Sequence, residues 1–351
     1  MSYFNLKNLA SQLIKGTALT AFLCVSGHVA NATNYTTSVF ATGAAVGSTA
    51  PDSVTYGGGS VWVEYGNGAN SSDYTGTSTI VRYSTSGAVL DTYKISGSVD
   101  GLKYNQATGQ VWALQNQDGN SKLSVIDPVA KTVTQYTYGA AYNSPATRGF
   151  DDVAFIGSKV FLSETNPAST SDPVVVQLNN TTLSSPLNLS TIQTGTGILA
   201  TDPDSLKATP TGGLVLTGEG DGALTFIANP GLATQTANSI TLSGAGGVTI
   251  GKPDDSVFAT YGTGVFYVAD TTANVVYAVS GTGLTTNSLF VSVGNEFGSV
   301  DPSTGIVTNI LSGSGLHGAD FVATPEPASI GLTLTSLFAI AVGCFRKRSA
   351  K

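Results

Sequence analysis

Short apolar runs alternate with Gly-bearing turns along most of the chain, and the pattern recurs about every fifty residues. Five stretches share the order of an acid, a short apolar strand, a turn and a second apolar strand. They begin at Pro51, Asp100, Phe150, Pro203 and Pro253. Their second strands carry anchors spaced 50, 49, 54 and 51 residues apart: Trp62, Trp112, Phe161, Val215 and Phe266. So regular a spacing indicates one structural unit copied along the chain.

Each unit contains two further runs rich in Val, Ile, Tyr and Thr, bounded by Gly, Asn, Asp or Pro, as antiparallel strands are. Four strands per unit predict an all-β fold, a β-propeller. A degenerate sixth copy begins at Glu296 and lacks one strand, while the run from Asn34 is one strand in surplus. We therefore expect six blades, the last one completed by the N-terminal strand, which removes an open edge. Seven blades or a pair of β-sandwiches are the alternatives.

Composition agrees with an exported all-β domain. Hydrophobic residues make up 41% of the chain, which supports a real core, and charged residues only 11%. Between Thr33 and Ala323 there are 9 Lys and Arg against 21 Asp and Glu, a net charge of −12. A body with this much negative charge repels phosphate backbones, and nucleic acid is therefore excluded as a partner. Both cysteines, Cys24 and Cys344, lie in the terminal apolar segments, so the body has no disulfide and no cysteine-based zinc site.

The two ends predict export. Residues 1–32 combine Lys7 and Lys15, a short apolar run and a small-residue site at Ala30–Ala32, which is the pattern of a signal peptide. The propeller then occupies residues 33–323. In the last segment, 324–351, residues 328–345 form an uncharged run of 18 residues, long enough for a transmembrane helix, followed by a basic tail.

The tail has a three-part order: Pro325-Glu326-Pro327, the apolar span, and Arg346, Lys347 and Arg348. This order resembles the PEP-CTERM sorting signal of exported bacterial proteins. The resemblance implies recognition and processing by an exosortase near the Pro-Glu-Pro triplet. It also implies transient anchoring in the inner membrane, then delivery to the cell surface or an extracellular polysaccharide matrix. An ordinary tail anchor is the alternative.

The body loosely resembles the NHL and YVTN-type propellers of secreted proteins. The likeness rests on the strand rhythm and on the spacing from acid to aromatic residue, and it covers most of residues 33–323. It includes no diagnostic motif, so no functional residue is transferred from those families.

One acid stands near the start of each repeat, and in a propeller the first strand of each blade lines the central channel. The candidate channel-mouth acids are Asp52, Asp100, Asp152, Asp204, Asp255 and Glu296. Six carboxylates together would suit a hard cation such as calcium. Acids at strand starts also bind neighbouring backbone amides, and we favour that structural role, with no cofactor. His317 is the body's one histidine, so a multi-histidine metal site is excluded, and we expect it to cap a turn.

Three further features have a functional and a structural interpretation. Asn116, Asp118 and Asn120 alternate as in a calcium loop, but no Glu closes it, so a hairpin tip is favoured. The polar loop from Glu64 could contact a sugar but is expected to be solvated. Trp62 and Trp112 could stack on glycan rings, but the phenylalanines in matching slots favour a packing role.

Two functions remain open at this stage. The first is a non-enzymatic surface or matrix protein, whose propeller is an interaction platform for extracellular polysaccharide or a surface protein. The second is a secreted propeller hydrolase or lyase with a metal ion in the central channel. The scarcity of catalytic side chains in the body favours the first.

Overall fold

The computed structural model describes residues 33–116, 120–139, 149–165, 174–180, 182–192 and 201–324. The predicted signal peptide (1–32), the Pro-Glu-Pro triplet, the predicted span and the basic tail lie outside these residues. Within the described part, no helix has both the length and the apolar character needed to cross a membrane. The fold described below is that of the body, Thr33–Thr324.

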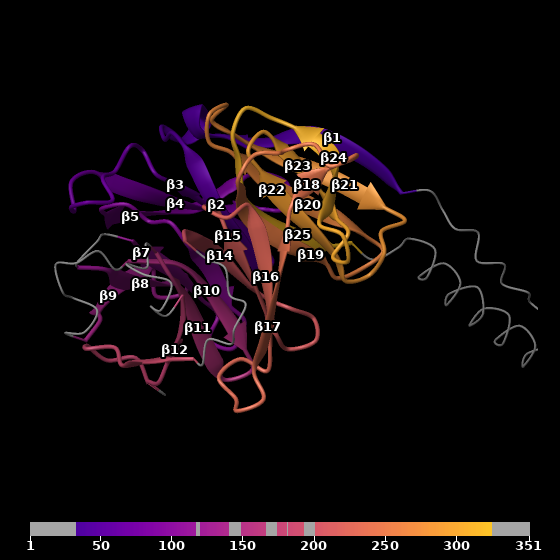
Figure 1. The fold of residues 1–351 in the computed structure, drawn as a ribbon. Coiled ribbons are helices and arrows are strands. Elements are labelled where there is room, and N and C mark those ends of the chain that lie inside the picture. Colours follow the sequence, from indigo (N-terminus) through magenta and orange to yellow (C-terminus); the bar gives the residue numbers. More distant parts are fainter. Residues whose placement is uncertain are drawn as a thin grey trace, which may run out of the picture. The chain divides into compact units, whose positions relative to one another are not determined.

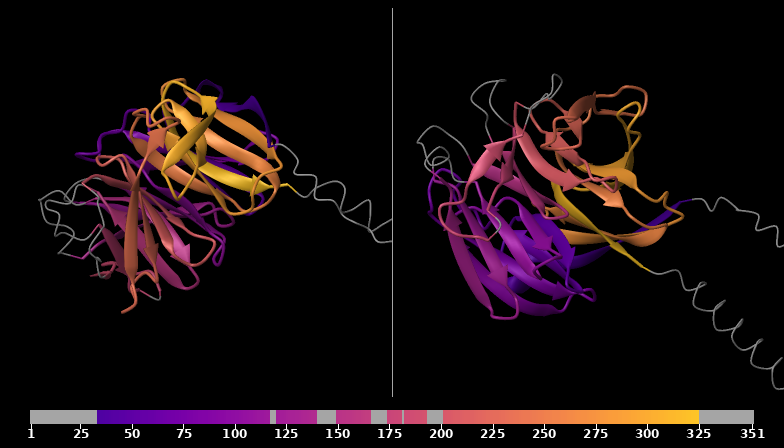
Figure 2. Two further views of the ribbon diagram at one scale, coloured as in Figure 1. Left: turned by 45° about the vertical axis from the view of Figure 1, so that its right-hand side comes forward. Right: turned by 90° about the horizontal axis from the view of Figure 1, so that it is seen from below.

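The described body forms six β-sheets, each one blade of a β-propeller (Figures 1 and 2). Blades 1 to 4 follow the chain, each an antiparallel four-stranded sheet with its first strand innermost. Blade 1 contains β2 (Pro51–Gly57), β3 (Ser60–Tyr65), β4 (Thr77–Ser84) and β5 (Val89–Ser96). Blade 2 contains β6 (Leu102–Asn105), β7 (Gln110–Gln115), β8 (Lys122–Asp127) and β9 (Thr132–Thr137). Blade 3 contains β10 (Phe150–Ile156), β11 (Lys159–Glu164), β12 (Val175–Leu178) and β13 (Leu189–Thr191). Blade 4 contains β14 (Pro203–Ala208), β15 (Leu214–Gly218), β16 (Ala223–Ala228) and β17 (Thr236–Thr241).

The last two blades exchange strands. From the centre outward, blade 5 contains β19 (Pro253–Ala259), β22 (Ser288–Val293), β23 (Glu296–Val300), β24 (Ile306–Ser312) and the short β18 (Ser243–Gly244). Blade 6 contains β25 (Leu316–Ala323), β20 (Thr263–Asp270), β21 (Val275–Thr282) and β1 (Asn34–Thr42). The chain therefore leaves blade 5 after its inner strand, makes two strands of blade 6, and returns. A short 3₁₀ turn, η2 (Gly43–Val46), follows β1.

The N-terminal strand completes the last blade, as predicted. β1 pairs antiparallel with β21 from Asn34 opposite Thr282 to Thr42 opposite Val275. In Figure 1 this indigo strand lies among the orange and yellow strands of the C-terminal part. The pairing joins the two ends of the body and covers the outer edge of β21.

Apolar clusters fill the space between neighbouring blades. Six are present in the described residues, and each combines side chains of two adjacent blades. Trp62 lies between blades 1 and 2, and Trp112 occupies the matching place between blades 2 and 3. The cluster containing Val63 and Val276 joins blade 6 to blade 1 and so closes the ring. Because both faces of a blade are covered, second strands such as β3 are buried along their whole length.

The prediction was correct for the first four repeats and wrong for the last two. The hairpins from Pro51, Asp100, Phe150 and Pro203 all form. The expected hairpin from Pro253 does not, because β19 pairs with β22 instead of β20. β20 and β22 carry equivalent anchors, Phe266 and Phe290, which pack against each other, so the local pattern fits either strand. The stretch from Glu296 supplies outer strands of blade 5 instead of a sixth repeat.

Candidate functional site

A β-bulge at the same point in four inner strands turns acidic side chains toward the channel. The pairing register slips between Pro51 and Val54, Phe150 and Val153, Pro203 and Leu206, and Pro253 and Ser256. Residues in a bulge are released from the hydrogen-bond ladder, and their side chains can be re-aimed. The released pairs are Asp52–Ser53, Asp151–Asp152, Asp204–Ser205 and Asp254–Asp255. A repeated backbone irregularity therefore concentrates carboxyl groups at one end of the channel.

Glycine allows the blades to approach each other at this level. A Cβ on Gly101 would lie 2.0 Å from the carbonyl oxygen of Asp151, and one on Gly318 would lie 2.4 Å from that of Asp52. Neither position could hold a side chain without moving the neighbouring strand. These close contacts link blade 2 to blade 3 and blade 6 to blade 1.

The inner strands of all six blades line a small cavity at this end of the channel. Matching positions carry Asp52, Asp100, Asp151, Asp204, Asp254 and His317, which we call the channel ring. Three predicted acids, Asp52, Asp100 and Asp204, lie in it. Asp152 and Asp255 are one residue further along their strands, beside Ser205 and Lys207, and they line the cavity as well. Glu296 does not line the cavity, because it starts β23, two strands away from the channel. Blade 6 contributes Gly318 to the lining, and the neighbouring His317 contacts Asp52 and Asp254.

His317 bridges two carboxylates of the ring. Its Nδ1 lies 2.9 Å from Oδ1 of Asp52 and 2.7 Å from Oδ2 of Asp254. Burial alone would lower the pKa of His317, but the hydrogen bonds to Asp254 and Asp52 and their charges outweigh it and raise the pKa to about 11. His317 is therefore an imidazolium cation at neutral pH, and it joins blade 6 to blades 5 and 1. Burial raises the pKa of Asp254 to about 6, although the bond from His317 acts in the opposite direction.

The other half of the ring holds protons instead of a cation. Burial, followed by the negative charges of Asp151 and Asp52, raises the pKa of Asp100 well above its usual range. The carboxyls of Asp100 and Asp151 share a hydrogen bond, and burial raises the pKa of Asp151 to about 7. Nδ2 of Asn116 donates to Asp100 at 2.7 Å and to Asp151 at 3.3 Å. Burial and the neighbouring carboxylates also raise the pKa of Asp204 well above its usual range.

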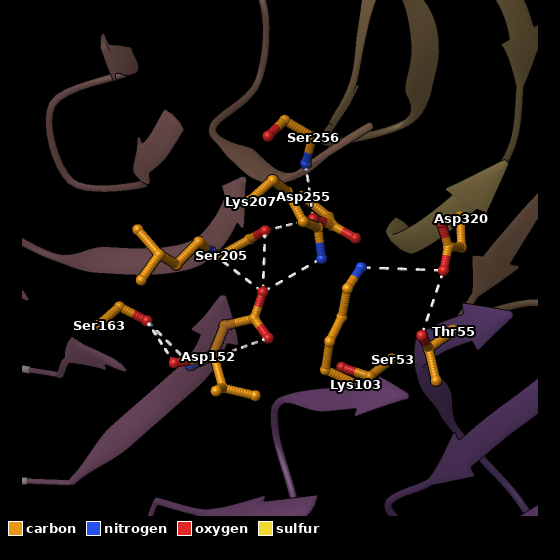
Figure 3. A network of polar contacts seen from close by, with 12 residues as sticks. Ser53, Thr55, Lys103, Asp152, Ser163, Ser205, Lys207, Asp255, Ser256 and Asp320 are labelled. Carbon is orange, nitrogen blue, oxygen red and sulfur yellow. Dashed lines mark hydrogen bonds and ion pairs between the residues drawn. The ribbon is translucent and has the colours of Figure 1, made fainter. Parts of the chain in front are cut away.

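A second tier lies around Lys207 (Figure 3). Nζ of Lys207 lies 3.1 Å from Oδ2 of Asp152 and 2.9 Å from Oδ1 of Asp255, and the three side chains are at most 9% exposed. Burial alone would lower the pKa of Lys207, but the charges of Asp152 and Asp255 outweigh it and raise the pKa above its usual range. Asp152 Oδ2 also accepts from the backbone N–H of Leu206 at 3.0 Å. This cation thus joins blades 3, 4 and 5.

Polar contacts of this kind join every pair of neighbouring blades around the channel. Ser53 Oγ donates to the carbonyl of Asp100, and Asp255 Oδ2 accepts from the N–H of Ala319 at 2.7 Å. Asp320 accepts from the N–H of Tyr56 at 2.8 Å and lies 3.8 Å from Nζ of Lys103 (Figure 3). Together with the bridges of Asn116, Lys207 and His317, these contacts form a closed polar circle inside the apolar one. The acids therefore act as latches between blades.

The ring fits a calcium ion poorly. Only Asp52, Asp254 and His317 bring their ligand atoms within 4.8 Å of one another among the described residues. Calcium takes oxygen ligands, whereas the third member here is an imidazole. A metal that accepts imidazole would first have to displace the proton that His317 retains up to about pH 11. The imidazolium already supplies the positive charge that a metal would bring.

The remaining candidate residues from the sequence analysis stabilise loops or pack between blades, as far as they lie within the described residues. Asp118 lies outside the described residues, and Asn116 is engaged by the channel ring. In the loop from Glu64, Asn67 accepts from the N–H of Thr49 at 2.8 Å, and Asp73 caps its own turn through the N–H of Thr75. Trp62 and Trp112 are 0% and 4% exposed, as their predicted packing role requires.

Sequence reasoning missed the two lysines of this site and did not assign His317 or Asn116 to it. Lys103 and Lys207 each stand three residues after a ring aspartate, and Asp320 stands three residues after His317. This repeated spacing was the available signal. On these three strands it places one side chain in the ring and another among the contacts that join the blades.

Neither a family model nor a curated protein matches the chain. Solved structures do: a protein of unknown function from Bacteroides caccae has a TM-score of 0.50 at 10% identity, covering 78% of this chain and 87% of that one. A periplasmic gluconolactonase from Pseudomonas aeruginosa has 0.47 at 16% identity, covering 78% and 89%. Virginiamycin B lyase from Staphylococcus aureus has 0.44 at 11% identity, covering 84% and 75%. At such low identity the likeness extends to the fold alone, which the six sheets show to be a six-bladed β-propeller.

Proposed function

We propose that this chain is an exported, non-catalytic β-propeller that serves as an interaction platform at the cell surface or in an extracellular polysaccharide matrix. Residues 1–32 act as the export signal. The segment 324–351 acts as a sorting signal that an exosortase recognises near Pro325–Pro327 and processes. The helix 328–345 anchors the chain in the inner membrane until then.

The location and volume of the cavities support this proposal. The cavity among the ring acids measures about 20 Å³, which accommodates about one water molecule. Three grooves on the blades measure about 660, 630 and 730 Å³, within the usual range for ligand sites. Ligand-sized space is therefore present on the blades and not among the acids that would carry out acid–base chemistry.

The charge state of the ring supports the same conclusion. A general base must be unprotonated near neutral pH and within reach of its substrate. His317 holds its proton between Asp52 and Asp254, so it cannot accept another one. We therefore assign the ring to closing the propeller.

The alternative is a secreted hydrolase or lyase with a metal ion at the channel mouth. The observation that favours it is the convergence of Asp52, Asp254 and His317, whose side chains are 22%, 27% and 36% exposed. A metal binding there would have to replace the proton on His317.

Binding and turnover assays on the purified protein distinguish the two functions. A glycan array and a pull-down with extracellular polysaccharide should show binding, and panels of lactones, esters and glycosides should show no hydrolysis or elimination. Metal-dependent turnover that is lost in His317→Gln would reverse the assignment. For the sorting segment, Glu326→Ala should leave the protein in the inner membrane fraction, whereas unchanged release would remove the exosortase from the proposal.

A further inference from the structure

One groove lies between blades 2 and 3, at the end of the propeller opposite the channel ring. It is lined by residues of the β6–β7 turn from Asn105 to Gln110 and by Gly157–Lys159 after β10. Both inner strands begin near ring acids, so their far ends are at the other face of the molecule. The groove measures about 730 Å³. We call it the blade 2–3 groove.

Its lining differs in charge from the rest of the body. Among the described residues no carboxylate lines it, although residues 33–323 carry a net charge of −12, and Lys159 is the one charged residue that does. Four amide side chains line it instead: Asn105, Gln110, Asn179 and Asn180. An amide offers both a donor and an acceptor, which matches a hydroxyl group that needs both.

An aromatic wall faces these amides. Trp112, Tyr136 and Phe155 line the groove, and the rings of Trp112 and Phe155 meet edge to face at 5.1 Å. Tyr136 and Phe155 are only partly buried, so part of each ring is accessible. A wall of aromatic carbon beside planar amides suits a ligand with apolar C–H faces and hydroxyl edges, which describes a pyranose ring.

The indole of Trp112 provides an independent observation. Its Nε1 is buried and has no hydrogen-bond partner among the described residues. Trp62, in the same position of blade 1, donates its Nε1–H to the carbonyl of Gly57 at 3.4 Å. Buried indole N–H groups normally donate a hydrogen bond, so a Trp112 Nε1–H without an acceptor at the wall of a groove requires an explanation.

We propose that the blade 2–3 groove binds a hexopyranose unit of a neutral glycan. The sugar stacks on the aromatic wall, its hydroxyls bond to the amides, and one hydroxyl or a bridging water accepts from Trp112 Nε1. This proposal rests on the interaction-platform function and deepens it by naming the ligand class. It leaves the channel ring to its role in closing the propeller.

The two tryptophans of the chain make the test specific, because each single substitution leaves one fluorophore. Full-length protein in a detergent without a sugar headgroup is titrated with cellohexaose, mannohexaose, maltohexaose and, as a charged arm, hexagalacturonate. In Trp62→Phe, Trp112 alone should respond to at least one neutral hexasaccharide. In Trp112→Phe, Trp62 should not respond, and calorimetry should show about 2- to 10-fold weaker binding, the loss of one hydrogen bond.

A second variant keeps the proposal falsifiable if Trp112→Phe perturbs packing. Gln110→Leu preserves the approximate volume of a partly buried side chain of the groove and should weaken binding by a similar factor with little change in melting temperature. Trp62→Phe is the matched control, with the same loss of volume outside the groove. It should retain full affinity and lower the melting temperature, because Trp62 loses its bond to Gly57 and its contact with Arg82 at 5.4 Å.

The failures of the two proposals are distinguishable. If glycans bind but Trp112→Phe and Gln110→Leu bind as tightly as the wild type, the groove is not the site and the platform function stands. Binding of hexagalacturonate alone would overturn the assignment to a neutral sugar. If no glycan on the panel binds at millimolar concentration, the groove proposal is wrong, and substrate turnover in the same sample would remove the platform function as well.

Discussion

Lys207→Met tests whether the acids around the channel are latches between blades. Nζ of Lys207 contacts Asp152 at 3.1 Å and Asp255 at 2.9 Å, and the side chains of these partners are 6% and 5% exposed. Methionine preserves most of the side-chain volume but leaves two buried carboxylates without a cation. Removing one member of a buried ion pair costs about 3–5 kcal/mol. For a domain of this size that corresponds to a fall in melting temperature on the order of 10 °C.

The pH dependence of the loss distinguishes this cause from a packing defect. The raised pKa of Lys207 keeps the wild-type lysine charged across neutral pH, so its contribution is constant there. In the variant, the uncompensated Asp152 and Asp255 can take up protons as the pH falls. The stability deficit should therefore be largest above pH 7 and should shrink toward pH 5. Adding Asp152→Asn and Asp255→Asn to the variant should restore part of the loss at pH 7.

The assay is urea unfolding followed by circular dichroism, with Lys252→Met as the control. Lys252 lies 3.6 Å from Glu219 but is 61% exposed, so its removal should cost about 0–1 kcal/mol. A Lys207→Met protein as stable as Lys252→Met, or a deficit that does not change with pH, would refute the assignment of Lys207 as a latch.

Three further predictions follow from the same structure. Thermal stability should fall as the pH rises from 5 to 9, because the folded state retains protons that the unfolded chain releases. The pKa is raised to about 7 for Asp151, about 6 for Asp254 and about 11 for His317. A rise in stability over this range would contradict the charge state of the ring. Calcium or a chelator should shift the melting temperature by less than about 1 °C, since the folded ring is not expected to bind calcium selectively. A larger shift would support a metal site at the channel mouth. Deleting residues 34–42 exposes the edge of β21, so the variant should melt earlier and associate in light scattering, whereas an unchanged monomer would disprove β1 as the closing strand.

The sequence was sufficient for the repeat but not for the final strand exchange. Trp62, Trp112 and Phe161 are buried at equivalent positions between neighbouring blades, and their regular spacing follows from this. The first four hairpins could therefore be recognised from the sequence. In blades 5 and 6 the strands with Phe266 and Phe290 are interchangeable by local pattern. Their partners are decided by packing against Phe297 and Phe321, which only the folded ring brings together.

The channel ring was predictable in kind but not in detail. A regular acid near each strand start indicated carboxyls at the channel, but the bulge brings both acids of a pair to the cavity. In the pairs Asp151–Asp152 and Asp254–Asp255 both residues lie in the bulge, and spacing alone selected the deeper one. His317 could not be assigned to the ring while its strand was counted as the third of a blade. Once β25 is the inner strand, His317 lies between the aspartates of the two neighbouring inner strands, Asp52 and Asp254.

The central claim is that the cation at the channel mouth is the imidazolium of His317 and that the ring is a latch. An NMR pH titration of ¹⁵N-labelled protein measures this directly, with His317→Gln to assign the signal, because the chain has only two histidines. The His317 ring should remain doubly protonated beyond pH 9, because its pKa is raised to about 11. A midpoint near the ordinary value of 6.5, or loss of the proton when a divalent metal is added at pH 7, would contradict it.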